Sequence, residues 1–270
     1  MDLGLGGAKV VVSGGSKGMG RAAAERFAAE GAEVAVLARG KEALDETVAA
    51  LRELGAPEAY ALPTDLTDPT SVQAAFDSVT QRWDGQLNVL VNAAGPVDVG
   101  VRGFDDLDDD EWQATFDIGT LSAVRCVRAA LPALRAAQWA RIVNVSAHST
   151  RRQSPRLVAY TAAKAALTSL SKNLAQSLAT DGILVNTVSP GSFLSAGLKS
   201  YLGALPSERN IDPESLVDAM RVIREDFHHP AFLPRAGDPA EIGPVIAFVG
   251  SRVNTYMTGA DINVDGGSDF

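Results

Sequence analysis

A tyrosine and a lysine stand four residues apart in the segment Tyr-Thr-Ala-Ala-Lys, residues 160–164. Residues 160–178 show apolar side chains at helical spacing, so Tyr160 and Lys164 are expected on one face of a helix. An ordinary tyrosine has a pKa of about 10, and a fixed positive charge nearby favours the phenolate and lowers that pKa. The pair could therefore exchange a proton with a substrate near neutral pH. Taken alone, the same spacing is also typical of an ordinary helix surface.

The composition indicates a globular protein with few options for metals or disulfides. The chain has 270 residues, of which 46% are hydrophobic and 21% charged, and its net charge of −9 argues against nucleic acid or an anionic membrane as a partner. The single cysteine, Cys126, excludes an intrachain disulfide and a cysteine metal cluster. His148, His228 and His229 lack the spacing of a zinc site, so no metal is predicted, and the adjacent pair is interpreted as a solvated loop feature. The sequence shows neither a signal peptide nor an apolar run of about 18 residues, so a cytoplasmic location is predicted.

A glycine-rich turn follows the first run of β-branched residues. Residues 9–13 predict a buried strand and residues 21–30 a helix, with Gly14, Gly18 and Gly20 between them. In that context the turn would let a phosphate approach the backbone and the start of the helix. The spacing Gly-x-x-x-Gly-x-Gly is also compatible with a plain strand–helix connection.

Two cations lie where a dinucleotide ribose would bind. Arg39 follows the second predicted strand, residues 33–38, and Lys17 lies in the glycine turn. NAD-binding units usually place an acidic residue near the end of this strand to bind the ribose 2′-hydroxyl. Two cations without a carboxylate favour a 2′-phosphate, so NADP is predicted over NAD. NAD stays possible if both bases are ordinary surface charges.

Strand and helix patterns alternate along the chain. Strands are predicted over residues 9–13, 33–38, 58–62, 87–92, 141–146, 183–189 and 262–264, and helices over residues 21–30, 41–54, 69–83, 108–137, 157–179 and 239–249. Asp68 is a predicted N-cap, Asp108 and Glu111 form a capping-box pattern, and Pro132 is predicted to break or kink its helix. The alternation predicts an α/β fold: a Rossmann-type, doubly wound parallel sheet of about seven strands with helices on both faces. Residues 192–234, which contain four prolines, are predicted to form a small helical substrate lid within a single domain of residues 1–270.

These motifs together resemble the short-chain dehydrogenase/reductase family. The resemblance covers residues 9–267 and rests on six motifs in a fixed order: Ser13-Gly14-x-x-x-Gly18-x-Gly20, Asp65, Asn92-Ala93-Ala94-Gly95, Tyr160-x-x-x-Lys164, Pro190-Gly191 and Asp265-Gly266-Gly267. It implies an NADP(H)-dependent oxidoreductase that interconverts a small carbonyl compound and a secondary alcohol. It also implies a homo-oligomer, a dimer or tetramer, with contacts through the helices predicted over residues 108–137 and 157–179.

The resemblance assigns roles position by position. Tyr160 would donate or accept the proton at the substrate oxygen, and Lys164 would bind the nicotinamide ribose and lower the pKa of Tyr160. The pyrophosphate and adenosine ribose would contact Gly14, Ser16, Lys17, Gly18, Met19 and Gly20. The rest of the cofactor site would comprise Asp65 and Leu66 at the adenine, Asn92, Ala93 and Gly95 at the middle of the cofactor, and Gly191, Phe193 and Ser195 at the carboxamide, with Pro190 beside them.

One departure from the family pattern concerns a serine. The family usually has a serine thirteen residues before the tyrosine, which hydrogen-bonds the substrate oxygen, and that position here is Ala147. The neighbouring Ser146 is a catalytic candidate only if the strand end is shifted by one residue, because consecutive strand residues point to opposite faces. His148 or Ser149 in the following loop could substitute.

A second departure concerns an asparagine. The family usually has one seven residues after the tryptophan that is Trp112 here, where it supports a water chain to the lysine, and that position is Gly119. Losing one hydrogen bond to a developing charge lowers a rate by about 10²–10³. Two interpretations stay open: an active enzyme with rearranged helper residues, or a catalytically impaired cofactor-binding protein with a redox-sensing or structural role.

The residues near the expected pocket do not specify a substrate. Arginines in the loop before Tyr160 could meet an anionic group, or could be solvated or paired with acids; they are Arg151, Arg152 and Arg156. Apolar residues in the predicted lid could face a substrate or pack within the protein; they are Phe193, Leu194, Leu198, Tyr201 and Leu202.

Overall fold

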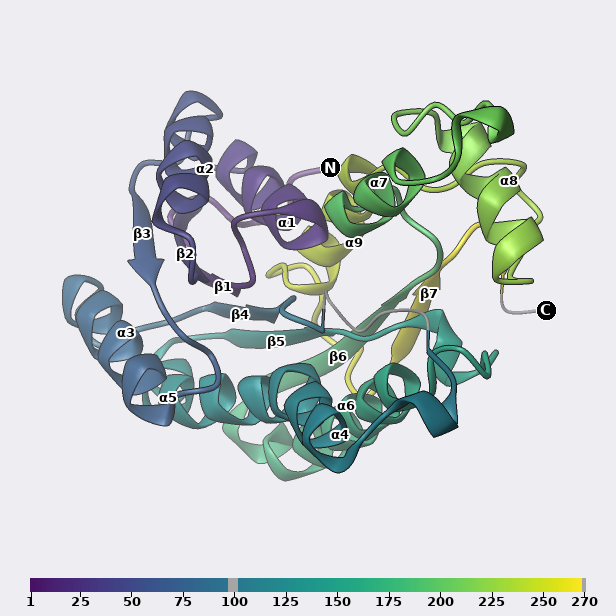
Figure 1. Ribbon diagram of the computed structural model, residues 1–270. Helices are drawn as coiled ribbons and strands as arrows, with labels where there is room; N and C mark the ends of the chain where they lie inside the picture. Colours follow the sequence, from purple (N-terminus) through teal and green to yellow (C-terminus); the bar gives the residue numbers. More distant parts are fainter. Residues whose placement is uncertain (97–101, 269–270) are drawn as a thin grey trace.

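A seven-stranded parallel sheet forms the centre of the computed structural model, which describes residues 1–96 and 102–268 (Figure 1). The strand order is β3-β2-β1-β4-β5-β6-β7, and every neighbouring pair is parallel. The strands are β1 Lys9–Ser13, β2 Glu33–Ala38, β3 Ala59–Pro63, β4 Val89–Asn92, β5 Ala140–Val145, β6 Ile183–Pro190 and β7 Asp261–Val264. This confirms the predicted doubly wound α/β sheet. The strand order reverses between β1 and β4, and ligands of such sheets bind at the carboxyl ends of the strands beside that point.

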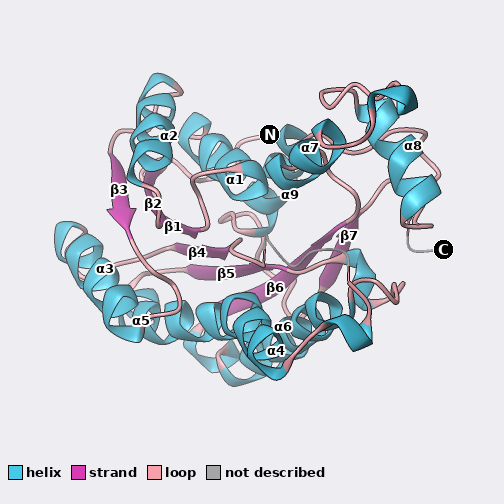
Figure 2. Cartoon of the chain, in the orientation of Figure 1, coloured by secondary structure: helices cyan, strands magenta, loops and turns pink. Residues whose placement is uncertain are grey.

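Helices cover both faces of the sheet (Figure 2). One face carries α1 Gly18–Ala29, α2 Lys41–Glu53 and α9 Pro239–Val249, and the other carries α3 Pro69–Arg82, α4 Asp109–Phe116, α5 Ser122–Ala136 and α6 Val158–Ser177. Each layer buries its own hydrophobic core against the sheet, one around Phe27 and the other around Phe76. In the part of the chain that the structure describes, no helix has both the length and the apolar character to cross a bilayer.

Two further helices lie between β6 and α9. They are α7 Ala196–Gly203 and α8 Leu216–Asp226, within the segment 192–234. Leu194, Leu202 and Met220 belong to a third, small core that joins α7 to α8. Figure 1 shows this pair beyond the β6–β7 side of the sheet, on the same side as α1 and α9. Leu194 and Leu202 therefore pack within this segment.

The predicted helix starts are confirmed at two positions. The Asp68 carboxylate accepts the amide of Thr70 at 2.8 Å and caps α3. The Asp108 carboxylate accepts the amide of Glu111 at 2.9 Å, and the Glu111 carboxylate accepts the amide of Asp108 at 3.0 Å. Both caps satisfy amides that a helix start leaves without intrahelical partners.

The helix predicted over residues 108–137 is interrupted at a place the sequence does not suggest. A π-helical turn, Asp117–Leu121, separates α4 from α5, whereas α5 continues through Pro132. Of the two predicted outcomes at Pro132, the break is therefore wrong, and the kink stays a prediction. Within the turn, the Thr120 hydroxyl donates to the Ala163 carbonyl on α6 at 2.7 Å. A β-carbon at Gly119 would lie 2.9 Å from that of Ala163, so this close contact between the turn and α6 requires glycine.

Candidate active site

Tyr160 and Lys164 lie one turn apart on α6, beside the carboxyl ends of the central strands. Lys164 is only 3% exposed, and its ammonium donates to the Val145 carbonyl at 2.8 Å and to the Ala94 carbonyl at 3.5 Å. No carboxylate of residues 1–96 or 102–268 pairs with it. Tyr160 is partly exposed, and its hydroxyl makes no hydrogen bond to the described residues. The fold thus brings a buried ammonium close to an unengaged phenol.

Burial shifts the pKa values of both groups toward their neutral forms. It raises the pKa of Tyr160 to about 12 and lowers the pKa of Lys164 to about 8. The predicted net lowering of the Tyr160 pKa is therefore not found in the protein by itself. The ammonium is held by backbone carbonyls at the ends of β4 and β5, and desolvation dominates at the phenol. Tyr160 is consequently protonated at neutral pH.

The predicted glycine turn leads directly into α1. The helix begins at Gly18, three residues before the predicted start, and no side chain of the described residues caps its first turn. Gly14 has a positive φ of 71°, and a β-carbon at Gly20 would lie 2.2 Å from the Gly14 carbonyl oxygen. A β-carbon at Gly18, in contrast, would point into open space, with no described atom beyond its own chain neighbours within 4 Å. This uncapped helix start has the geometry and partial positive charge that suit a phosphate.

Lys17 and Arg39 are both exposed next to this helix start. Neither makes an ion pair within the described chain, and Arg39 is close enough to Asp65 to contribute to its electrostatics. The pKa of Asp65 lies below its usual range mainly because its carboxylate accepts hydrogen bonds from the Thr67 hydroxyl and amide, with a smaller effect of Arg39. The two predicted phosphate-binding cations are therefore available to a ligand.

Ser16 and Met19 are partly buried and contact neighbouring elements. The Ser16 carbonyl accepts the Thr47 hydroxyl of α2 at 3.2 Å, and Met19 packs against the core between α1 and the sheet. Leu66, the residue after Asp65, is buried, and its carbonyl accepts Arg125 at 3.2 Å. These contacts fix the backbone around the carboxyl ends of β1 and β3.

A chain of buried polar side chains connects the sheet to α6. The Ser13 hydroxyl donates to Asn92 at 3.3 Å, Asn92 donates to Asn144 at 2.8 Å, and Asn144 donates to Ser171 at 2.8 Å. The predicted site residue Asn92 therefore uses its side chain inside the protein. Sequence reasoning misses Asn144 and Ser171. A polar side chain within a run as apolar as residues 140–145 could have indicated Asn144 as part of a buried polar network. The network holds α6, which carries Tyr160 and Lys164, in register with β4 and β5.

Ala93 and Gly95 follow β4 directly. The Ala93 amide donates to the Ser13 carbonyl at 3.0 Å, which keeps the chain beside β1. A β-carbon at Gly95 would lie 3.1 Å from the ammonium nitrogen of Lys164. The small residue at this position leaves room for the lysine at the carboxyl edge of the sheet.

The residues after β6 are closely packed against other parts of the protein. Pro190 ends the strand, and a β-carbon at Gly191 would lie 2.6 Å from the Asp265 Cα. Phe193 is buried against Gly237, and the Ser195 hydroxyl caps α7 by accepting the Leu198 amide at 3.2 Å. The side chains of Phe193 and Ser195 are thus engaged within the protein.

The loop after β5 shows what surrounds Ala147. The Ser146 hydroxyl is buried between the Lys164 carbonyl at 3.1 Å and the Thr168 hydroxyl at 2.7 Å, so it is directed at the backbone of α6. Ser149 is also buried, and its hydroxyl lies 3.4 Å from that of Thr161, the residue after Tyr160. Of the two serines, Ser149 is the one beside the turn of α6 that carries Tyr160.

Comparison with known proteins identifies the family of this chain. The sequence profile described as "Enoyl-(Acyl carrier protein) reductase" matches residues 14–269. The chain belongs to the short-chain dehydrogenase/reductase family. It is 30% identical over 267 residues to the "Uncharacterized oxidoreductase YvrD" of Bacillus subtilis (strain 168), covering 99% of this chain and 98% of that protein. It is 32% identical over 260 residues to meso-2,3-butanediol dehydrogenase of Serratia marcescens, covering 96% of this chain and 93% of that protein.

A solved structure agrees with this assignment. The L-sorbose reductase of Gluconobacter frateurii, complexed with NADPH and L-sorbose, superposes with a TM-score of 0.90 at 29% sequence identity, covering 100% of this chain and 99% of that one. Dehydrogenases and reductases of alcohol and carbonyl groups thus match this chain over nearly its whole length. The chain is an oxidoreductase of that class within the short-chain dehydrogenase/reductase family.

The arginines of the loop before Tyr160 contact the protein itself in this family member. Arg151 pairs with the Asp261 carboxylate at 3.1 Å, and Arg152 donates to the Ser268 carbonyl at 2.8 Å and to the Pro230 carbonyl at 3.4 Å. Arg156 reaches the carbonyl of Asp226, the last residue of α8, at 3.5 Å. These contacts support the alternative in which the arginines serve the fold. Arg156 also lines a narrow crevice at Tyr160, together with Arg102, Leu107, Leu157, Val158 and Ala159.

His229 differs from its prediction. The sequence predicts a solvated pair of adjacent histidines, and His228 is exposed, but His229 is only 8% exposed. It lies against His148 of the loop after β5, with ring centroids 5.7 Å apart. Adjacent residues after a helix end need not share an environment, and the positive φ of 56° at His228 turns the chain so that His229 enters the interior.

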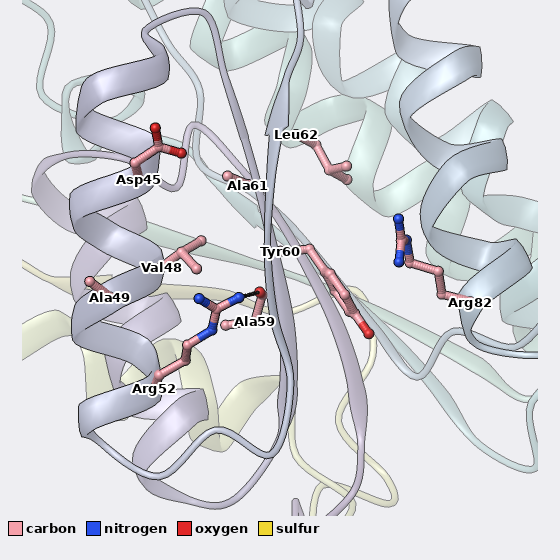
Figure 3. Close-up of a pocket in the computed structure, with 9 residues that line it drawn as sticks. All are labelled: Asp45, Val48, Ala49, Arg52, Ala59, Tyr60, Ala61, Leu62 and Arg82. Carbon is pink, nitrogen blue, oxygen red and sulfur yellow. Dashed lines mark hydrogen bonds between the residues drawn. The ribbon is translucent and has the colours of Figure 1, made fainter.

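A separate hollow lies at the opposite edge of the sheet (Figure 3). It has a volume of about 310 Å³ between α2 and the edge strand β3. Arg82 lies 5.2 Å from the Tyr60 ring, and Arg52 donates to the Ala59 carbonyl at 3.0 Å, so both arginines are engaged there. Neighbouring strands are about 4.8 Å apart, which places β3 roughly 20 Å from the β5–β6 region beside Tyr160. This hollow is not part of the candidate active site.

Proposed function

We propose that this protein is an NADP(H)-dependent oxidoreductase that interconverts a small carbonyl compound and a secondary alcohol, with Tyr160 as the general acid/base and Lys164 as its assistant. The observation that supports this most is the unengaged Tyr160 hydroxyl one turn from a 3% exposed ammonium that no described carboxylate neutralises. Burying a charge without an opposite charge is costly. A catalytic role accounts for such a group at the carboxyl edge of the sheet.

The residues around β1 and β2 fit NADP(H). The uncapped first turn of α1 offers backbone amides to a pyrophosphate, and Lys17 and Arg39 offer two cations to a 2′-phosphate. The NADPH named for the Gluconobacter frateurii L-sorbose reductase structure supports the same choice. When bound, the nicotinamide exchanges a hydride with the substrate carbon. The other proposed cofactor contacts are Gly14, Ser16, Gly18, Met19, Gly20, Asp65, Leu66, Asn92, Ala93, Gly95, Tyr160, Lys164, Pro190, Gly191, Phe193 and Ser195.

The proposed proton transfer uses the two shifted pKa values. In reduction, the Tyr160 phenol, whose pKa of about 12 keeps it protonated, donates its proton to the substrate oxygen. The phenolate that remains is stabilised by the Lys164 ammonium one helical turn away. In oxidation the phenolate accepts the proton of the alcohol instead. The Lys164 pKa of about 8 keeps this group mainly cationic at neutral pH.

A second candidate function is a catalytically impaired cofactor-binding protein, which two positions favour. Ala147 offers no hydroxyl to a substrate oxygen, and Gly119 offers no amide. The β-carbon of any larger residue at Gly119 would lie 2.9 Å from the β-carbon of Ala163. The π-helical turn and α6 thus approach each other at the place where the family's asparagine would stand. This protein would sense the nicotinamide redox state or act as a structural subunit.

The overall organisation is part of the proposal. Residues 1–270 form one catalytic domain, in which residues 192–234 act as the substrate lid; residues 97–101 and 269–270 of that domain lie outside the described structure. A dimer or tetramer would form through the outer faces of the helices α4, α5 and α6. A cytoplasmic location is proposed on the same sequence grounds as before.

Turnover with a panel of ketones, diketones and secondary alcohols separates the two candidate functions. Purified protein is assayed with NADPH and NADH in both directions, and cofactor binding is titrated by fluorescence on the same sample. The oxidoreductase proposal expects tighter binding of NADPH than of NADH and turnover of at least one panel member. Tight NADPH binding without turnover of any compound would favour the second candidate, and binding of neither cofactor would contradict both.

A further inference from the structure

Two buried histidines meet where the segment after α8 touches the loop after β5. His148 and His229 are each 8% exposed, and their rings form an edge-to-face pair with centroids 5.7 Å apart and an interplanar angle of 75°. His148 belongs to the loop that leads to Tyr160, and His229 belongs to the proposed lid, residues 192–234. The contact therefore joins the lid to the catalytic side of the protein.

The same loop is anchored to three other parts of the site. The Nδ1 of His148 lies 3.2 Å from the carbonyl of Pro190, the last residue of β6. Arg152 donates to the carbonyl of Pro230, the residue after His229, and to the carbonyl of Ser268 near the end of the described chain. A displacement of His229 would thus disturb contacts of the lid, of the end of β6 and of the C-terminal segment.

The surroundings of His229 disfavour a positive charge. Burial lowers its pKa, and the positive potentials of His148, Arg152 and His228 lower it further, against a smaller opposing effect of a hydrogen bond with the Gln153 backbone. Two acids on the neighbouring elements are paired elsewhere: Asp226 of α8 pairs with Arg209 at 2.6 Å, and Asp261 of β7 pairs with Arg151. Asp265 accepts the Gly267 amide at 2.9 Å through Oδ1, whereas its buried Oδ2 has no hydrogen-bond partner among the described residues.

We propose that His229 is a positioning residue that seats the segment after α8 on the loop after β5 only as a neutral imidazole, so that acidification releases this side of the lid. The inference rests on the proposed function, because that function assigns residues 192–234 as the lid. The edge-to-face contact with His148 is between two aromatic rings, and a proton on His229 would place a charge beside Arg152 in a buried position.

The direction of the pH effect follows from proton linkage. In the seated arrangement His229 binds a proton less tightly than a solvated imidazole, whose pKa is about 6.5. The seated arrangement is therefore fully favoured above about pH 6.5 and loses stability as the pH falls below that value. At about pH 5.5 the protonated form of a released histidine outnumbers the neutral form by about tenfold. The opening equilibrium constant should therefore increase by up to about tenfold.

Hydrogen–deuterium exchange on the full chain, without substrate, measures this opening directly. Peptides covering residues 226–235 and 148–157 are followed at about pH 7.5 and about pH 5.5, after correction for the intrinsic pH dependence of exchange. In the wild-type protein the opening equilibrium of both segments should rise several-fold, up to about tenfold, at the lower pH. Peptides of the sheet, such as those covering β1, should show no such change.

Variants assign the effect to His229. His229→Phe keeps an aromatic ring against His148 without a titratable group, and His229→Gln is a smaller, polar alternative should the first variant fold poorly. Either variant should lose the pH dependence. His228→Asn is the matched control, because His228 is exposed and asparagine tolerates its positive φ of 56°; it should retain the pH response, since His228 is the smallest of the contributions to the His229 pKa.

Protection that does not change with pH in the wild type would overturn the inference, as would the wild-type pH response in a folded His229 variant. The measurement needs no turnover, so its failure is distinct from that of the proposed function. Absence of enzyme activity contradicts the proposed function alone, whereas unchanged protection contradicts the role of His229 alone.

Discussion

Replacing Lys164 with methionine should abolish catalysis without destabilising the protein. Lys164 is 3% exposed, lacks a carboxylate partner among the described residues, and has its pKa lowered by burial from 10.5 to about 8. A side chain in that state is a cost to folding that only a function explains. Methionine has a similar length and no charge, so it should fill the same space without that cost.

The magnitude follows from the lowered pKa. The difference between 10.5 and about 8 corresponds to about 3 kcal/mol by which the folded state disfavours the charged lysine at neutral pH. Methionine cannot donate to the Val145 carbonyl, and a buried carbonyl that loses its partner costs about 1–3 kcal/mol. The free energy of unfolding of Lys164→Met should therefore equal that of the wild type or exceed it by up to about 2 kcal/mol.

The comparison also has a characteristic pH dependence. Because the folded-state pKa of Lys164 is lowered, the unfolded chain binds this proton more tightly, and wild-type stability rises as the pH increases from about 8 to 10.5. The methionine variant lacks this rise. Between about pH 7 and about pH 9.5, the wild type should gain about 2 kcal/mol relative to the variant.

The assay is urea denaturation of both proteins at these two pH values, combined with a measurement of the rate at which each protein reduces a carbonyl substrate. Lys172→Met is the matched control, because Lys172 is exposed two turns further along α6 and its replacement should change neither property. A loss of more than about 2 kcal/mol in Lys164→Met would refute the reasoning, since removing one partner of a structural buried ion pair costs about 3–5 kcal/mol. Wild-type turnover in Lys164→Met would refute the catalytic role.

Three further predictions concern the cofactor and the two unusual positions. Arg39→Gln should weaken NADPH binding by about 10–100-fold, the loss expected for one charge-assisted contact, and leave NADH binding unchanged in a fluorescence titration; equal losses for both cofactors would contradict a 2′-phosphate contact. Gly119→Asn should lower the free energy of unfolding by about 1–3 kcal/mol, because its β-carbon would lie 2.9 Å from that of Ala163, and a thermal melt at or above that of the wild type would show that the π-helical turn tolerates a side chain. Ala147→Ser should raise turnover by up to about 10²-fold if a hydroxyl there reaches the substrate oxygen, whereas an unchanged rate would indicate that another group, such as Ser149, already fills that role.

Much of the fold could be predicted from the sequence because local patterns and global topology agree. The strand of residues 9–13, the helix 239–249 and the caps at Asp68 and Asp108 each have a local physical cause, and the structure places them within a few residues of prediction. A right-handed connection through a helix leaves little freedom in ordering parallel strands. Gly14 and Gly20 could likewise be recognised as parts of a tight turn, because the spacing of glycines after a predicted strand is itself a local signal.

The features that the sequence does not predict depend on contacts between distant segments. The π-helical turn at Gly119 lies close against Ala163 of α6, and nothing in residues 117–121 alone indicates that neighbour. His229 is buried because it meets His148, which is 81 positions earlier in the numbering. The pKa of Tyr160 depends on how deeply α6 is covered, and one-turn spacing to Lys164 carries no information about burial.

The turnover of Tyr160→Phe tests the central claim most directly. The variant removes one oxygen atom that has no hydrogen-bond partner among the described residues, so the fold and the NADPH dissociation constant should stay within about twofold of the wild type, while turnover should fall by about 10²–10⁴-fold, the usual contribution of a general acid/base. Tyr256→Phe, at a side chain that is 97% exposed, is the control and should keep its activity. Wild-type turnover by Tyr160→Phe would contradict the assignment of Tyr160 as the proton-transferring residue.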